Sequence, residues 1–168
     1  MKWKRNGLLI EEPIMEYLSK VFDEEIGKGH KIEVKIGTDS QKSGKQYKFA
    51  TIILITTRED LGGGTTVGRG GIIISTTYYH TFKKKNKDLV NERMVFEVGK
   101  SVEVAYEIAT LLDDYGIKLE IHADINPNPK YESNKALQTA IGYILGMGYE
   151  FKIKPNAIAS SNCADKLC

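Results

Sequence analysis

The sequence predicts an α/β domain in which a mixed β-sheet is covered by helices on both faces. Three stretches with strand-like alternation follow one another through short connections, which favours an antiparallel meander. Two later strand-like stretches are each preceded by a helical segment, which favours further strands in the same sheet. The predicted order is therefore α-βββ-α-β-α-β, followed by a short terminal helix.

The first predicted element is a helix over residues 8–26. Pro13 would lie in its first turn, where a missing N–H costs little. Gly27 and Gly29 would end it. Apolar side chains recur at a nearly helical period along this segment: Ile10, Ile14, Leu18, Val21 and Phe22.

Three strands are predicted next, over residues 31–39, 46–57 and 71–82. In the first, apolar side chains alternate with Glu33, Lys35, Gly37 and Asp39, so that one face is apolar. A turn at residues 42–45 leads to the second strand, and the glycines at 62–64 precede the third.

The second half of the chain predicts a long helix over 88–115, a strand over 118–125, a helix over 133–147 and a strand over 149–154. The long helix has one apolar stripe, formed by Met94, Val98, Val102, Ala105, Ile108 and Leu112. No repeat or linker interrupts the pattern, so residues 1–168 are expected to form a single domain.

The composition is typical of a soluble globular protein, with 41% hydrophobic and 27% charged residues. No apolar run approaches the roughly 20 residues that span a bilayer, and the apolar stretch near the N-terminus is too short for a signal peptide. We therefore expect a cytoplasmic protein without a membrane partner. The two cysteines, Cys163 and Cys168, are expected to be ordinary reduced thiols.

The net charge of +2 neither requires nor excludes a nucleic-acid partner. One dense basic run, from Lys83 to Lys87, is a candidate contact for phosphates. The alternative is a solvated turn, which is the usual setting for such a run.

Two aspartates end alternating strands and give the first indication of a site. Asp39 closes the first predicted strand and Asp124 the fourth, with His122 on the same face as Asp124. If these strands are adjacent and parallel, joined by the long helix, the two carboxylates meet at one sheet edge. Their repulsion would be relieved by a hard divalent cation such as Mg²⁺ or Mn²⁺. Each aspartate alone could instead be a cap or turn former.

The element order and several short stretches resemble the ribonuclease H-like superfamily, and more narrowly its YkuK-type family of bacterial proteins. The stretches cover nearly the whole domain and are IGTDSQ at 36–41, FE at 96–97, HADI at 122–125, SNK at 133–135, IKP at 153–155 and ASS at 159–161.

This resemblance implies a three-layer α/β/α fold with a five-stranded mixed sheet of order 3-2-1-4-5. It also implies metal-binding acidic residues at four places. Asp39 and Asp124 match the first two. A glutamate of the long helix is the third, for which Glu97 fits best and Glu103 and Glu92 are alternatives.

The fourth implied acidic residue comes from the C-terminal segment, where Asp165 occupies the matching place. Such sites hold two Mg²⁺ or Mn²⁺ ions for phosphodiester hydrolysis. His122 and Lys154 are candidates for proton transfer or phosphate binding, although His122 could simply be a hydrogen-bond partner and Lys154 a solvated lysine.

The resulting hypothesis is a metal-dependent nuclease acting on RNA, DNA or a hybrid of the two. The alternatives are a non-catalytic module that binds nucleic acid or a protein partner, and another phosphoryl-transfer enzyme such as a phosphatase or a nucleotide-using kinase. The absence of a GxGxxG, P-loop or zinc pattern from the sequence gives no reason to expect a nucleotide cofactor.

Overall fold

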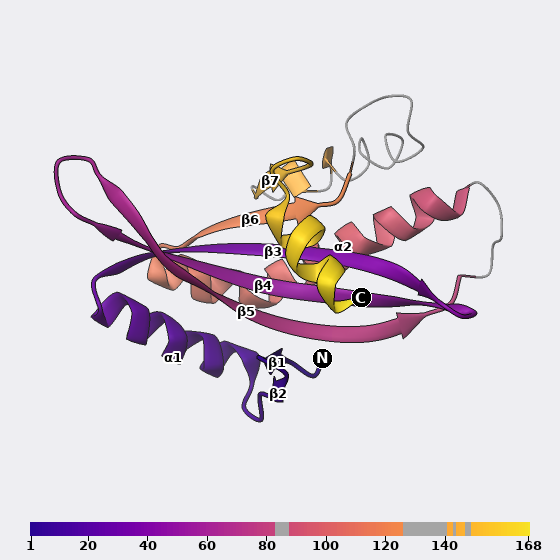
Figure 1. The fold of residues 1–168 in the computed structure, drawn as a ribbon, viewed down its shortest axis with the longest axis horizontal. Coiled ribbons are helices and arrows are strands. Elements are labelled where there is room, and N and C mark those ends of the chain that lie inside the picture. The colour runs from indigo at the N-terminus through magenta and orange to yellow at the C-terminus, as the bar shows by residue number, and fades with distance from the viewer. Residues whose placement is uncertain (83–87, 126–140, 143, 147–148) are drawn as a thin grey trace.

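A computed structural model describes residues 1–82, 88–125, 141, 142, 144–146 and 149–168. The described strands form one mixed sheet of order β2-β1-β5-β4-β3-β6-β7. The helices pack on its two faces (Figure 1).

The centre of the sheet is a long antiparallel meander of β3 (His30–Ser43), β4 (Gln46–Asp60) and β5 (Thr66–His80). These strands extend further than the alternation predicts, because main-chain pairing continues through their polar ends. On the other side of β3, β6 (Lys118–Ala123) and β7 (Glu150–Lys152) add in parallel.

The N-terminal residues form two short strands that the sequence pattern did not reveal, β1 (Lys4–Arg5) and β2 (Leu8–Leu9). Asn6 and Gly7 both have positive φ and turn the chain between them. The hairpin pairs with the outer edge of β5 and buries Trp3. The first helix, α1, consequently begins at Ile14 instead of residue 8.

This hairpin overturns the predicted strand count of five and, for the whole sheet, the order 3-2-1-4-5. The sheet has seven strands, of which the five that had been expected lie side by side as β5-β4-β3-β6-β7. The apolar run Leu8–Ile10 fits the period of the helix that follows, and a two-residue strand is too short to show alternation, so the sequence pattern predicts a helix where the structure has a hairpin.

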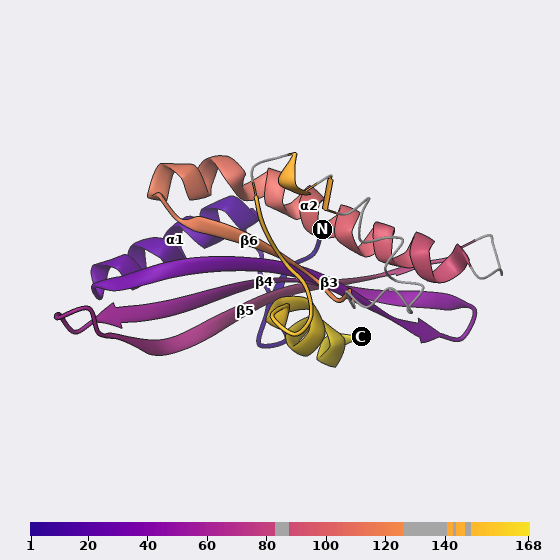
Figure 2. The ribbon, with the colours of Figure 1, turned by 90° about the horizontal axis from the view of Figure 1, so that it is seen from above.

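One face of the sheet is covered by α1 (Ile14–Gly27) and α2 (Asp88–Tyr115), which lie on the same side (Figure 2). The bounds of α2 match the predicted helix. Its apolar stripe packs into the main core together with side chains of α1, β3 and β6. Large, fully buried members of this core are Leu18, Phe22, Ile36, Ile108 and Ile121.

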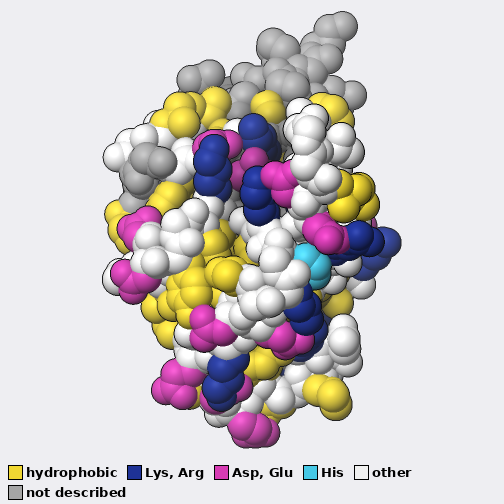
Figure 3. Space-filling model, turned by 90° about the vertical axis from the view of Figure 1, so that its left-hand side faces the viewer, with side chains coloured by type: hydrophobic (Ala, Val, Ile, Leu, Met, Phe, Trp, Pro, Cys, Tyr) yellow, Lys and Arg dark blue, Asp and Glu magenta, His cyan; other side chains and the backbone are white. Residues whose placement is uncertain are grey.

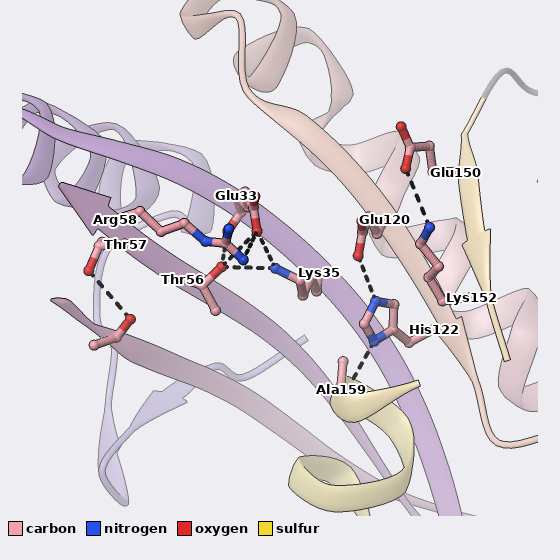
Figure 4. Close-up of polar contacts among 11 residues, drawn as sticks. Glu33, Lys35, Thr56, Thr57, Arg58, Glu120, His122, Glu150, Lys152 and Ala159 are labelled. Carbon is pink, nitrogen blue, oxygen red and sulfur yellow. Dashed lines mark hydrogen bonds and ion pairs between the residues drawn. The ribbon is translucent and has the colours of Figure 1, made fainter. Parts of the chain in front are cut away.

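The opposite face is covered over part of its area by the C-terminal segment, a turn of π-helix, η1 (Ala159–Ala164), followed by a 3₁₀ turn, η2 (Asp165–Leu167). Ala159 and Ala164 pack on Ala50, Ile52 and Leu54 of β4. Away from this segment the same face carries polar side chains, including the linked Glu33, Lys35 and Thr56 (Figure 4).

Two predicted features fall largely outside the described residues. The helix over 133–147 is represented by 141, 142, 144 and 145, which are helical. The basic run Lys83–Lys87 lies entirely outside them. Within the described part of the chain, no helix has the length and apolar character needed to cross a membrane.

Candidate functional site

The pairing of β3 with β6 places the two candidate aspartates next to each other. These strands are parallel neighbours, as the long connection through α2 predicted, and their last register pair is Thr38 with Ala123. Asp39 directly follows Thr38, and Asp124 directly follows Ala123. The two aspartates therefore lie side by side where the parallel pairing of β3 and β6 ends, although β3 itself continues to Ser43 in its pairing with β4. Ligands gather at the carboxyl end of such parallel pairing in open α/β sheets.

Asp39 is buried, with 9% of its surface exposed. Its pKa is raised to about 6, mainly by burial, with smaller contributions from the negative charges of Asp124 and Asp165. Alternation along β3 directs Asp39 to the same face as Gly37, which lies against Ala159 and Ser160 of the C-terminal segment. The Cys168 thiol donates to the main-chain oxygen of Asp39 at 3.1 Å.

Asp124 is held from the C-terminal part of the chain by two donors. The Lys154 Nζ lies 2.7 Å from its Oδ1, and the Ser161 Oγ donates to the same oxygen at 2.8 Å. The side chain of Asp124 is 22% exposed, so this carboxylate is more exposed to solvent than the buried Asp39. Lys154, predicted as a site lysine or a solvated one, thus contacts a candidate ligand directly.

Glu97 approaches the same edge from the helical face of the sheet. It is 5% exposed, and its Oε1 accepts a hydrogen bond from Ser40 at 2.5 Å and lies 3.5 Å from the Arg93 Nε. Burial raises the pKa of Glu97 to about 8, with smaller contributions in the same direction from Asp39 and Asp124. At neutral pH the metal-free protein therefore keeps this carboxyl largely protonated.

The other helix glutamates lie elsewhere. Glu92 is exposed, and Glu103 is exposed and paired with Lys100 at 2.6 Å. Of the three, Glu97 is the one whose carboxyl contacts β3 next to Asp39. Asp165 is exposed at the start of η2, and it is near enough to Asp39 for its charge to raise the pKa of Asp39.

His122 is a buried hydrogen-bonding residue between the sheet and the C-terminal segment (Figure 4). Its Nδ1 accepts the main-chain N–H of Ala159 at 3.1 Å, which leaves the ring proton on Nε2, 3.0 Å from Glu120 Oε2. Burial lowers the pKa of His122 and keeps it neutral. Both ring nitrogens are engaged, so this geometry supports the alternative of a hydrogen-bond partner over a proton-transfer role.

The chemistry of these side chains fits a hard divalent cation, because the neighbouring negative charges that help to raise the pKa of Asp39 and of Glu97 would be relieved by Mg²⁺ or Mn²⁺. Within the described residues, no three His, Cys, Asp or Glu side chains are grouped so as to hold a metal ion. Asp124 instead pairs with a cation of the protein itself, Lys154, and the Arg93 guanidinium lies near the protonated Glu97 carboxyl.

Three polar residues of this region were missed from the sequence: Ser40, Arg93 and Ser161. Ser40 directly follows Asp39, so alternation alone places it on the opposite face, towards α2. Arg93 precedes Glu97 by one helical turn, a spacing at which such side chains meet. Ser161 had no comparable signal, because its contact with Asp124 depends on how η1 packs against the sheet and not on a local sequence pattern.

Charged side chains at the end where β4 and β5 are joined are of mixed sign (Figure 3). Lys31 pairs with Asp60, and Arg69 pairs with Glu59. These cations are thus neutralised locally, and this end of the molecule does not present the basic stripe that marks many nucleic-acid-binding domains.

The fold and the adjacent aspartates define an α/β protein with acidic side chains at the carboxyl edge of its central parallel strands. A family model described as Ribonuclease H-like matches residues 14–168, and the chain belongs to this family. No curated protein and no solved structure matches the chain. The narrower YkuK-type resemblance fits this family and stays a prediction.

Proposed function

We propose that the protein is a divalent-metal-dependent nuclease that hydrolyses phosphodiester bonds of RNA, DNA or a hybrid. The observation that supports this most is the adjacency of Asp39 and Asp124, which follow the last register pair of β3 and β6. The ribonuclease H-like fold is consistent with a nucleic-acid substrate.

In this proposal Asp39 and Asp124 are the central ligands of Mg²⁺ or Mn²⁺, with Glu97 and Asp165 completing the set. Bound metal would supply Lewis-acid stabilisation of the attacking water and the leaving oxygen. Glu97 would release its proton on joining the set, and Ser40 would orient its carboxylate. Asp124 would have to exchange its Lys154 contact for the cation, and Glu97 its Arg93 contact.

The substitution Asp39→Asn tests this function. We expect it to abolish Mn²⁺ binding in a calorimetric titration and to lower hydrolysis of single-stranded, duplex and hybrid oligonucleotides by about 100-fold or more, because a central ligand loses its charge. Asp60→Asn is the matched control, since Asp60 pairs with Lys31 at the distant end of β4. Unchanged Mn²⁺ binding by the Asp39 variant would contradict the proposal.

A second candidate function is a non-catalytic module that binds nucleic acid or a protein partner. The ion pair of Asp124 with Lys154 favours it, because an acidic residue already neutralised by the protein needs no metal. In that case replacing the lysines at 83, 84, 85 and 87 by glutamine would abolish binding of an oligonucleotide, and Asp39→Asn would leave that binding unchanged.

A further inference from the structure

Asp124 is contacted by two donors that both come from the C-terminal part of the chain. Its Oδ1 accepts both Lys154 Nζ at 2.7 Å and Ser161 Oγ at 2.8 Å. One donor is a full positive charge and the other is neutral, although both come from the part of the chain after β7. Asp124 is therefore neutralised by a side chain that lies close to it only through the folding of the C-terminal part.

We propose that Lys154 is the counter-cation of Asp124 in the metal-free protein and that a divalent cation competes with it for this carboxylate. The inference rests on the proposed function, since it concerns the same metal site. It adds that the ammonium group of Lys154 lowers the affinity of the site for metal.

Competition follows from the charges. The second oxygen of a carboxylate lies only about 2 Å from the first, so a metal ion on either oxygen of Asp124 would stand within a few ångströms of the ammonium group. Two cations at that separation repel each other in a partly buried site. The ammonium group of Lys154 must therefore move away from Asp124 when a metal ion binds. If it stays in place, its charge weakens metal binding.

Exposure indicates which partner yields. The side chain of Lys154 is 47% exposed, whereas that of Asp124 is 22% exposed. Lys154 also lies beyond the last paired residue of β7, Lys152. A lysine on a flexible stem can return its ammonium to water at little cost, while the aspartate is fixed at the end of β6.

Ser161 has the complementary role. Its neutral hydroxyl can keep its hydrogen bond to Asp124 while a cation is bound, because an ordered hydrogen bond to a ligating carboxylate fixes its orientation. The C-terminal segment therefore need not leave the sheet when Lys154 leaves Asp124.

The test is a Mn²⁺ titration by calorimetry of the full-length protein and three variants. Lys154→Gln removes the competing charge, and we expect it to bind Mn²⁺ about three- to tenfold more tightly than the wild type. Lys154→Arg keeps the charge and should stay within about twofold of the wild type. Lys152→Gln is the matched control, because Lys152 is similarly exposed but pairs with Glu150 at 3.8 Å; we expect no more than about a twofold change.

A thermal melt supplies a readout that does not depend on activity. In EDTA, Lys154→Gln should melt a few degrees below the wild type, because Asp124 loses its counter-charge. Saturating Mn²⁺ should raise the melting temperature of this variant by more than it raises that of the wild type.

The outcomes separate this inference from the proposed function. If Asp39→Asn abolishes Mn²⁺ binding but Lys154→Gln binds no more tightly than Lys152→Gln, the competition is overturned and the metal site stands. Weaker binding by Lys154→Gln would show that Lys154 assists the metal, which also overturns it. If neither the wild type nor Lys154→Gln binds Mn²⁺, both proposals fail.

Discussion

Two carboxyl groups beside the β3–β6 edge hold protons at a pH where free carboxyl groups are ionised. Burial raises the pKa of Asp39 to about 6 and that of Glu97 to about 8. A group whose pKa is higher in the folded than in the unfolded state stabilises the fold at low pH, and this stabilisation is lost as the pH rises through the folded value. Both groups therefore weaken the fold between about pH 4 and pH 8.

Replacing Glu97 by glutamine removes the larger of these two contributions. In EDTA, we expect the free energy of unfolding to decrease between pH 5 and pH 8.5 by on the order of 3 kcal/mol more in the wild type than in Glu97→Gln. Urea denaturation at the two pH values measures this difference. Glu103→Gln, on an exposed part of the same helix, serves as the control and should retain the wild-type slope. Equal slopes for the wild type and Glu97→Gln would refute the assignment of a buried, protonated Glu97.

The element that brings the C-terminal residues to the site depends on one glycine. A Cβ at Gly37 would lie 2.5 Å from the main-chain nitrogen of Ser160 and 2.8 Å from the carbonyl carbon of Ala159. These are main-chain atoms, which cannot move aside as the end of a side chain can. The absence of a side chain at Gly37 therefore allows η1 to pack closely against β3, and this packing places Ser161 within hydrogen-bond distance of Asp124.

We expect Gly37→Ala to displace this segment and to destabilise the protein by about 1 to 3 kcal/mol. Hydrogen exchange should show faster exchange at amides 159–164, whereas amides of α1 should keep their protection. Gly71→Ala is the control, because its Cβ would make ordinary contacts of 3.5 Å with Leu54 and 3.6 Å with Ile55. Unchanged protection of η1 in Gly37→Ala would show that the segment adapts to the added methyl group.

At the scale of the whole molecule, the N-terminal hairpin is joined to the same core as the sheet and the long helix. Trp3, the single tryptophan of the chain, is 5% exposed and belongs to the main apolar cluster. Its fluorescence should therefore report the unfolding of the domain as a unit. We expect the urea transitions followed by tryptophan fluorescence and by far-ultraviolet circular dichroism to coincide. A fluorescence transition at lower urea would mean that the hairpin undocks separately.

Sequence patterns were sufficient where local periodicity fixes the structure. The alternation in β3 and β6 predicted the two strands that bring Asp39 and Asp124 side by side, although β3 continues past Asp39 to Ser43. The apolar stripe predicted α2. The hairpin of β1 and β2 escaped because its strands are too short to show a period. The contact of Lys154 with Asp124 was not predicted for another reason. The two residues lie in irregular segments, and the distance between these segments depends on the packing of η1 against Gly37.

The pairing of β3 on its two sides also bears on the order of folding. Towards β4 it closes through a two-residue turn at Gly44 and Lys45, whereas towards β6 it must wait until the chain has returned through α2. Local hairpins form ahead of such distant contacts. A folding intermediate that contains only the meander would have Asp39 in place without Asp124 beside it. A ligand that needs both carboxylates would then have no binding site until late in folding. Such a ligand would lower the unfolding rate and leave the folding rate unchanged.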